Sequence, residues 1–272
     1  MRTLSLYFVL VLFFVPGQAQ ISVSPPALFM NSHNPFGTFI VENKTGEAQE
    51  VAVKFRFGYP ASDSIGNLSM RYEDSIAEAQ YSLTGWVKGF PRKFILMPGA
   101  QQIIRLTTQP PPNLSDGMYW TRIVTSAQPQ AKRIDTVRTG ITTQINIVFE
   151  QITTVLFSKG ALTTGIEILD PFIVEDSASV RLVWKTVKNG NAPYFGTVSV
   201  TVSDESGTIV DETVETLGIY MTMNKKASFD RKKLKKGNYV AEIKFVTERN
   251  DIAADNIIQL APIVKKTAFT IK

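Results

Sequence analysis

The residue types that perform most catalysis are scarce in this chain. It has no cysteine and a single histidine, His33, which lies in the polar segment NSHNPFG. A Ser-His-Asp set would have to use this one histidine, and a Cys-His set cannot be formed. A zinc site needs at least three nitrogen, sulfur or carboxylate ligands, and no second histidine or cysteine is present to supply them. We therefore interpret His33 as a surface turn residue and predict no metal and no cofactor.

Adjacent acidic residues are the remaining candidates for catalysis, because two carboxylates suffice for a glycosidase. The four pairs fall in predicted turns or at strand ends, where charged side chains are normally solvated. No glycine-rich phosphate loop and no EF-hand spacing is present. We therefore predict that the chain is not an enzyme. The four pairs are Glu73-Asp74, Glu175-Asp176, Asp204-Glu205 and Asp211-Glu212.

The first residues have the pattern of a secretory signal peptide. Arg2 supplies the positive start, the run from Leu4 to Val15 is almost purely apolar, and Gly17-Gln18-Ala19 offers small residues at the cleavage site. An uncleaved membrane anchor is the alternative, but the apolar run is shorter than the roughly 20 residues that span a bilayer. We predict a signal peptide over residues 1–19 and an exported chain with no stable membrane insertion after cleavage.

Basic residues are concentrated near the end of the chain, although the formal net charge is only +5. The charge is too small to indicate a nucleic-acid partner, and none is predicted. The favoured interpretation of the run is a solvated hairpin that protects a sheet edge from aggregation. The alternative is contact with a polyanion or a lipid headgroup. The run consists of Lys225, Lys226, Arg231, Lys232, Lys233, Lys235 and Lys236.

Apolar residues alternate with polar ones almost everywhere, which is typical of β-strands. In GMYWTRIVTS, which begins at Gly117, Tyr119 and Thr121 share one face, while Trp120 and Arg122 share the other. The only helical candidate is the segment from Glu73 to Gln80. Many short strands separated by turn signals predict an all-β fold of the sandwich type.

The second half of the chain has the same character with different details. Three strands are predicted within 179–220, with turns at Asn189-Gly190 and at 205–207, and two more strands near the end of the chain. Each half offers about seven strands, so one large sandwich is the less favoured alternative. We predict two immunoglobulin-like β-sandwich domains in tandem, over residues 20–157 and 158–272.

The stretch KFILMPGAQQIIRL, from Lys93 to Leu106, predicts a strand, a corner and a return strand. Pro98 lacks an N–H and has a fixed φ, so it fits a corner better than the interior of a ladder. Gly99 can adopt the positive φ that a tight corner needs. We interpret this stretch as scaffold at one end of a sandwich.

Several segments, taken in order, resemble the N-terminal immunoglobulin-like domain of PapD-like periplasmic pilus chaperones. They cover Ile21 to Phe157, and the second half occupies the place of that family's second β-domain. The resemblance implies a periplasmic chaperone whose last first-domain strand pairs with an exported, pilin-like subunit. The segments are ISVSPPALFM, FIVENKTGEAQEVAVKF, FILMPGAQQIIRL, DGMYWTRIV and TQINIVFEQITTVLF.

The resemblance implies a partner-binding site at Ile145, Ile147 and Phe149, which are spaced by two and so share one face of a strand. The alternative is that these residues belong to the core of the first domain. The family also anchors the subunit's C-terminal carboxylate with two basic residues. Those positions fall here on Ala27 and on Thr153, or on Ile152 with a later gap, and none of them is basic.

Two other arginines, Arg105 and Arg122, are expected near that anchor but do not match its positions, so the resemblance assigns them no role. Two functions stay open. One is a periplasmic chaperone-like protein that binds exported subunits by strand addition. The other is a structural or adhesion module of the cell envelope without chaperone activity, which predicts that the last first-domain strand is paired on both sides within the chain.

Overall fold

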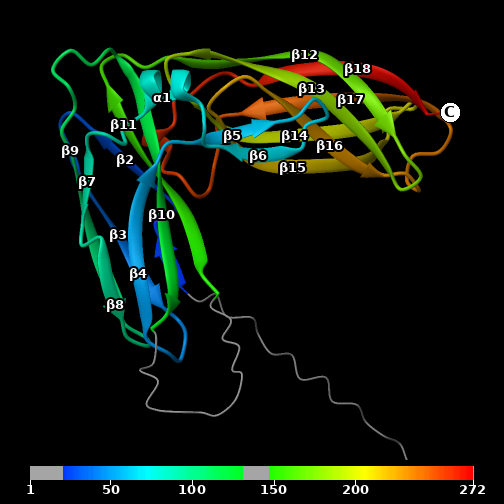
Figure 1. Cartoon of the computed structure of the whole chain (residues 1–272). Helices are drawn as coiled ribbons and strands as arrows, with labels where there is room; N and C mark the ends of the chain where they lie inside the picture. Colours follow the sequence, from blue (N-terminus) through cyan, green and yellow to red (C-terminus); the bar gives the residue numbers. More distant parts are fainter. Residues whose placement is uncertain (1–20, 131–146, 272) are drawn as a thin grey trace, which may run out of the picture.

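The structure is a computed structural model that describes residues 21–130 and 147–271. Within them the chain forms two β-sandwiches set at an angle to one another (Figure 1). This arrangement confirms the predicted all-β class with two sandwiches. The predicted signal peptide lies outside the described residues.

The first sandwich packs two sheets around one core. Neighbouring strands are antiparallel, except that β2 and β11 are parallel. Aromatic and aliphatic side chains at alternate positions, such as Phe39, Ile104, Ile123 and Phe157, fill the space between the sheets. One sheet has the order β1 (Ile21–Ser24), β3 (Phe36–Asn43), β9 (Gln101–Thr108), β7 (Val87–Phe90); the other has the order β2 (Ala27–Asn31), β11 (Phe149–Lys159), β10 (Gly117–Pro129), β4 (Gln49–Arg56), β8 (Lys93–Leu96).

The Pro98-Gly99 corner lies between these two sheets. The strand before it, β8, pairs with β4, whereas the strand after it, β9, pairs with β3 and β7. Gly99 has φ of +70°, and its N–H donates to the carbonyl of Asn43 at 2.9 Å. The corner predicted from the sequence is confirmed.

The chain also changes sheets between β1 and β2. The change occurs at Pro25-Pro26, where neither residue has an N–H to continue a ladder. Strand β1 therefore pairs with β3, and β2 begins only at Ala27 in the opposite sheet. As a result β2 runs beside only part of β11.

Within the described residues, the second sandwich has seven strands and its own core. Its first sheet has the order β12 (Thr164–Glu175), β13 (Ser179–Gly190), β16 (Met223–Asp230), and its second has the order β15 (Ile209–Ile219), β14 (Tyr194–Asp204), β17 (Gly237–Val246), β18 (Ile263–Ile271). A 3-10 helix, η1 (Ala254–Asn256), lies between β17 and β18. Strand β11 extends to Lys159, just past the expected domain boundary, and the boundaries themselves remain a prediction.

A third apolar cluster joins the two sandwiches. Its centre is Trp120 of β10, whose ring lies 5.6 Å from that of Phe57, 5.0 Å from that of Tyr81 and 4.9 Å from that of Tyr220. Phe195 of β14 completes the contact from the second sandwich. Because this cluster is buried and aromatic, it fixes one sandwich against the other.

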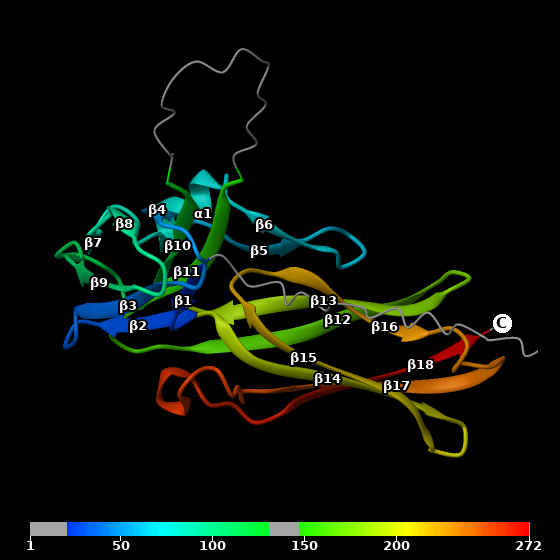
Figure 2. The same cartoon turned by 90° about the horizontal axis from the view of Figure 1, so that it is seen from below.

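A hairpin of the first sandwich reaches over the second (Figure 2). It consists of β5 (Tyr59–Ser62) and β6 (Leu68–Arg71), and helix α1 (Ser75–Tyr81) follows it. The helix confirms the helical prediction, and Asp74 caps it by accepting from the N–H of Ala77 at 3.0 Å. The hairpin was not predicted. Its Ser62 hydroxyl accepts from the N–H of Asn224, so it covers the edge strand β16.

The basic run is only partly the solvated hairpin that was expected. Most of its residues are exposed, but Lys225 of β16 is buried, and its Nζ donates to both carboxylate oxygens of Glu215 at 2.7 and 2.8 Å. The side chain of Lys225 is on the same buried face of β16 as those of Met223 and Ala227. The run of basic residues did not indicate this.

Candidate partner-binding site

Strand β11 is paired differently along its two halves. Strand β10 pairs with it from Phe149 to Lys159. On the opposite side, β2 pairs with it only from Thr154 to Ser158. Within the described parts of the chain, no strand pairs with this side of Phe149–Thr153, which we call the open edge. An unpaired edge offers backbone N–H and C=O groups to another strand.

The direction of each amide along the open edge follows from the pairing. The N–H of Thr154 donates to the carbonyl of Pro26 at 3.1 Å, so it points away from β10. Amide directions alternate along a strand. The N–H groups of Glu150 and Ile152 therefore point out at the open edge, while those of Gln151 and Thr153 point toward β10.

Apolar side chains are exposed at and beside the open edge. Ile147, Val148, Phe149 and Ile152 are between 42% and 55% exposed. Contiguous exposed apolar residues of this kind are typical of a surface that binds a partner. Gln151 lies among them, and its side-chain amide donates to the carbonyl of Val23 at 3.5 Å, which bridges β11 to β1.

The predicted site residues lie at this edge as far as the structure describes them. Phe149 is the first residue of β11, and Ile147 precedes it. Both are exposed, and neither belongs to the core cluster of the first sandwich. Ile145 lies outside the described residues. A role of the three residues in binding remains a prediction.

A pocket of about 200 Å³ lies between the two sandwiches, next to Thr154. Its wall includes Arg122, a residue that is only 6% exposed. Arg122 donates from Nε to the carbonyl of Gly58 at 3.0 Å and from Nη1 to the hydroxyl of Thr154. Its Cζ lies 4.6 Å from the centre of the Tyr220 ring. The pocket therefore contains a buried positive charge.

A second arginine reaches the same pocket from the second sandwich. Arg249 donates from Nε and Nη2 to the two carboxylate oxygens of Asp251, at 2.9 and 2.5 Å, and from Nη1 to the carbonyl of Leu217 at 3.0 Å. The hydrogen bonds from Arg249 lower the pKa of Asp251, so this carboxylate is ionised at neutral pH. The charge of Arg249 is thus neutralised by Asp251.

Ala27 and Thr153, which stand where the resembled family has two basic residues, lie in different surroundings. Ala27 opens β2 and lines the pocket, while Thr153 is buried toward the core of the first sandwich. Arg105 is exposed on β9 of the other sheet and is not part of the pocket. Arg122 was not assigned a role from the sequence. The sequence signal that could have singled it out is its place on the same face of a strand as Trp120. In the structure both side chains donate to the carbonyl of Gly58.

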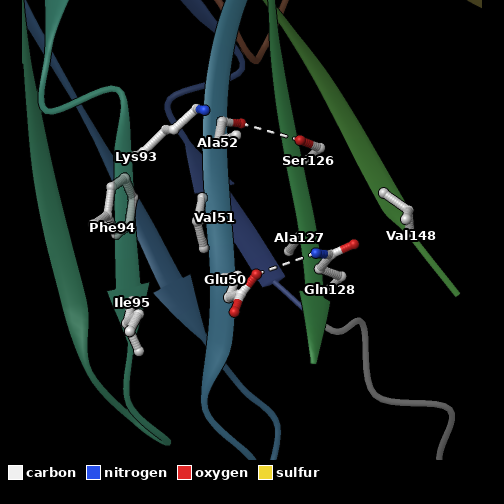
Figure 3. A pocket seen from close by; sticks show the side chains of 10 residues that line it. All are labelled: Glu50, Val51, Ala52, Lys93, Phe94, Ile95, Ser126, Ala127, Gln128 and Val148. Carbon is white, nitrogen blue, oxygen red and sulfur yellow. Dashed lines mark hydrogen bonds between the residues drawn. The ribbon is translucent and has the colours of Figure 1, made fainter. Parts of the chain in front are cut away.

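A larger hollow of about 620 Å³ lies over β4, β8 and β10 (Figure 3). Its polar side chains bond across the sheet: Ser126 Oγ donates to the carbonyl of Ala52 at 3.3 Å, and Gln128 Nε2 donates to Glu50 at 3.2 Å. None of its lining side chains has a buried polar atom without a partner in the part of the chain that the structure describes. Ligand sites usually contain a few polar groups that point into the pocket and are free to bind the ligand. We therefore assign no ligand to this hollow.

Two further features of the described ranges, 21–130 and 147–271, bear on function. They contain no helix with the length and apolar character needed to cross a membrane. They also contain no group of three or more potential metal-ligating side chains that lie together.

Comparisons with known proteins give matches among solved structures. A scan against protein-family models and a search of curated proteins found no match. A chaperone–tip adhesin complex of CFA/I fimbriae biogenesis matches with a TM-score of 0.44 and 15% identity over 91% of this chain and 98% of that chain. The E. coli chaperone DraB matches with a TM-score of 0.46 and 10% identity, over 93% and 96%. The Salmonella enterica SafA pilin in complex with the SafB chaperone matches with a TM-score of 0.43 and 13% identity, over 90% and 95%. These are resemblances of fold.

Proposed function

We propose that this chain is a periplasmic chaperone-like protein that binds an exported, pilin-like or surface-assembly subunit by β-strand addition. The subunit's strand pairs with the open edge of β11, and alternate apolar side chains of Ile147 and Phe149 contact it. The role is binding and not catalysis. The predicted signal peptide supports the proposed location.

The observation that carries the proposal is the combination of an unpaired edge with exposed apolar side chains. An added strand would satisfy the outward N–H groups of Glu150 and Ile152 with main-chain hydrogen bonds. It would also remove the exposed apolar side chains beside that edge from water, which favours association. Backbone pairing gives affinity, and side-chain contacts give selectivity.

A structural or adhesion module without chaperone activity is the alternative. Two observations favour it. Strand β11 is paired on both sides over Thr154–Ser158. Ala27 and Thr153 also replace the two basic residues that the family resemblance would require.

Hydrogen exchange on the mature protein tests the open edge. The amides of Glu150 and Ile152 should exchange rapidly, while those of Gln151 and Thr153 should be protected by β10. Adding an N-acetylated peptide of alternating valine and threonine residues should then slow exchange at Glu150 and Ile152. Slow exchange at these two amides in the protein alone would support the structural-module alternative.

Substitutions test the side-chain contribution. Ile147→Asp and Phe149→Asp should each weaken peptide binding about tenfold or more, because each removes an apolar side chain from the contact and places a charge there. Val214→Asp is the matched control, because Val214 is also an exposed apolar residue but lies on β15 of the second sandwich. Equal binding by all three variants would contradict the proposed site.

A further inference from the structure

The sheet formed by β1, β3, β9 and β7 has an outer face with exposed apolar side chains that the proposed function does not use. Alternation along the strands defines this face: Phe39, Ile104 and Leu106 point into the core, so the residues between them point outward. In Figure 1, β3, β9 and β7 lie on the side of the first sandwich that is turned away from the second. The large apolar residues of the outer face are Phe36, Ile40, Phe90 and Ile103, which are between 37% and 74% exposed.

Strand pairing gathers these side chains around one cation. Arg105 of β9 lies opposite Phe90 of β7 on one side and opposite Thr38 of β3 on the other. Ile103, two positions earlier on β9, lies opposite Ile40 of β3. Because directly opposed residues on one face of a sheet have Cβ atoms roughly 5 Å apart, the apolar side chains and Arg105 form one continuous patch.

The outer face carries a net positive charge. Lys88 of β7 and Arg105 project from it, and neither has a carboxylate partner in the part of the chain that the structure describes. Lys88 Nζ donates instead to the neutral side chain of Gln109 at 3.3 Å. Glu42 is the one carboxylate on the outward side of these four strands, all of which are described, and its Oε2 lies 3.6 Å from Nζ of Lys44. The two cations without carboxylates therefore favour an anionic partner.

The size and shape of the outer face indicate which kind of anionic partner fits. Neither of the two hollows described above is lined by any of its residues. The four strands present about a dozen outward-facing residues, whereas a standard protein interface uses about 20–30 on each side. A membrane surface needs no matching pocket, because binding to it grows with the apolar area buried and with the attraction between cations and anionic lipids.

We propose that the outer face binds reversibly to the surface of an anionic phospholipid bilayer. The rings of Phe36 and Phe90 enter the boundary between headgroups and acyl chains, while Lys88 and Arg105 contact lipid phosphates. This binding goes beyond the proposed function and does not depend on it. The open edge of β11 belongs to the opposite sheet, so a membrane and an added strand can be bound at the same time.

The basic run near the end of the chain fits a lipid surface less well. Lys225 pairs with Glu215, and Lys233 Nζ lies 2.9 Å from the carboxylate of Asp211, so part of its charge is already neutralised. Leu234, the apolar residue within 231–236, is buried. The segment 231–236 therefore offers charge without exposed apolar area, and it supplies a control site.

Co-sedimentation of the mature protein with vesicles tests the proposal. We expect binding to vesicles of phosphatidylglycerol and phosphatidylcholine in equal parts, little binding to phosphatidylcholine alone, and weaker binding as salt is raised. Arg105→Ser should weaken binding to the anionic vesicles about fivefold, and Phe36→Ser about tenfold. Lys236→Ser in the basic run and Val214→Ser on β15 are the matched controls and should leave binding unchanged.

Single cysteine labels locate the contact, because the chain has no cysteine of its own. An environment-sensitive fluorophore attached after Thr38→Cys, within the outer face, should shift its emission to the blue when anionic vesicles are added. The same fluorophore attached after Val214→Cys should not respond. This measurement does not rely on a loss of affinity, so it stays informative if Phe36→Ser or Arg105→Ser folds poorly.

Several results would overturn the proposal. One is the absence of binding to anionic vesicles, or equal binding to the two lipid compositions. Another is loss of binding in Lys236→Ser but not in Arg105→Ser, or a blue shift at Val214→Cys but not at Thr38→Cys, because either would place the contact on the second sandwich. Concentration-dependent association of the protein that Phe36→Ser abolishes would instead assign the outer face to a second copy of this chain.

Discussion

Replacing Gly66 with alanine should loosen the hairpin that joins the two sandwiches. Gly66 lies at the hairpin tip with φ of +78°, and a Cβ added there would lie 2.9 Å from the carbonyl carbon of Lys225 and 3.1 Å from the backbone nitrogen of Lys226. Both neighbours belong to β16 of the second sandwich. Because the nearest atom is backbone, the hairpin and β16 must separate to admit the methyl group.

The cost has two components. Alanine at a positive φ costs about 1–2 kcal/mol in any context. Separation also weakens three hydrogen bonds: Asn224 N–H to Ser62 at 2.7 Å, Asn224 Nδ2 to the carbonyl of Asp63 at 3.0 Å, and Lys226 Nζ to Asn67 at 2.5 Å. Each contributes about 0.5–1.5 kcal/mol, and less where it is exposed. We expect an extra loss of about 1–3 kcal/mol in the free energy of unfolding.

Gly99→Ala is the matched control for this prediction. Gly99 has a similar φ of +70° in the same sandwich, but a Cβ there would meet nothing within 4 Å. Denaturant unfolding should therefore show a larger loss of stability for Gly66→Ala than for Gly99→Ala. Exchange of the Asn224 amide should also accelerate in Gly66→Ala alone. Equal losses and an unchanged Asn224 amide would refute the interpretation of the hairpin as a clamp on β16.

Two further predictions concern charged and titratable side chains. Burial and the hydrogen bond to Asp74 raise the pKa of Tyr59 from 10.0 to about 12, so its contribution to stability is fully present below pH 10 and lost as pH rises toward 12. Tyr59→Phe should reduce the fall in unfolding free energy over this range, measured by denaturant titration at each pH. Glu215→Gln should destabilise the second sandwich by about 1–2 kcal/mol, because it leaves the buried Lys225 ammonium without a carboxylate, and the partial exposure of Glu215 limits the loss. Lys225→Met should cost less than Glu215→Gln in the same unfolding assay, since methionine removes the buried charge altogether.

Features that depend on local sequence were predictable. Alternation in GMYWTRIVTS and the Pro98-Gly99 corner follow from backbone geometry and from what proline and glycine allow, and both appear in the structure. The helix from Ser75 to Tyr81 follows in the same way, because Asp74 can cap it without help from distant parts of the chain.

Features that depend on contacts between distant residues were not predictable in this way. The hairpin from Tyr59 to Arg71 has polar residues at its tip and gains its position from Asn224 and Lys226, more than 150 residues later in the chain. Lys225 looks like its charged neighbours, and only the fold shows that it points inward to meet Glu215.

Arg122 is the clearest case in which the exposure expected from the sequence pattern differs from the burial found in the structure. Alternation placed it on the face of β10 opposite to Ile123, which in an isolated sandwich would be the solvent face. The second sandwich covers that face through Tyr220, so a side chain that should be hydrated is buried instead. The pairing of β10 with β11 places the guanidinium beside Thr154, which is the first residue of β11 that β2 pairs with. The open edge follows from Pro25-Pro26, which delays the start of β2, whereas the burial of Arg122 follows from the second sandwich, and the two features meet at Thr154.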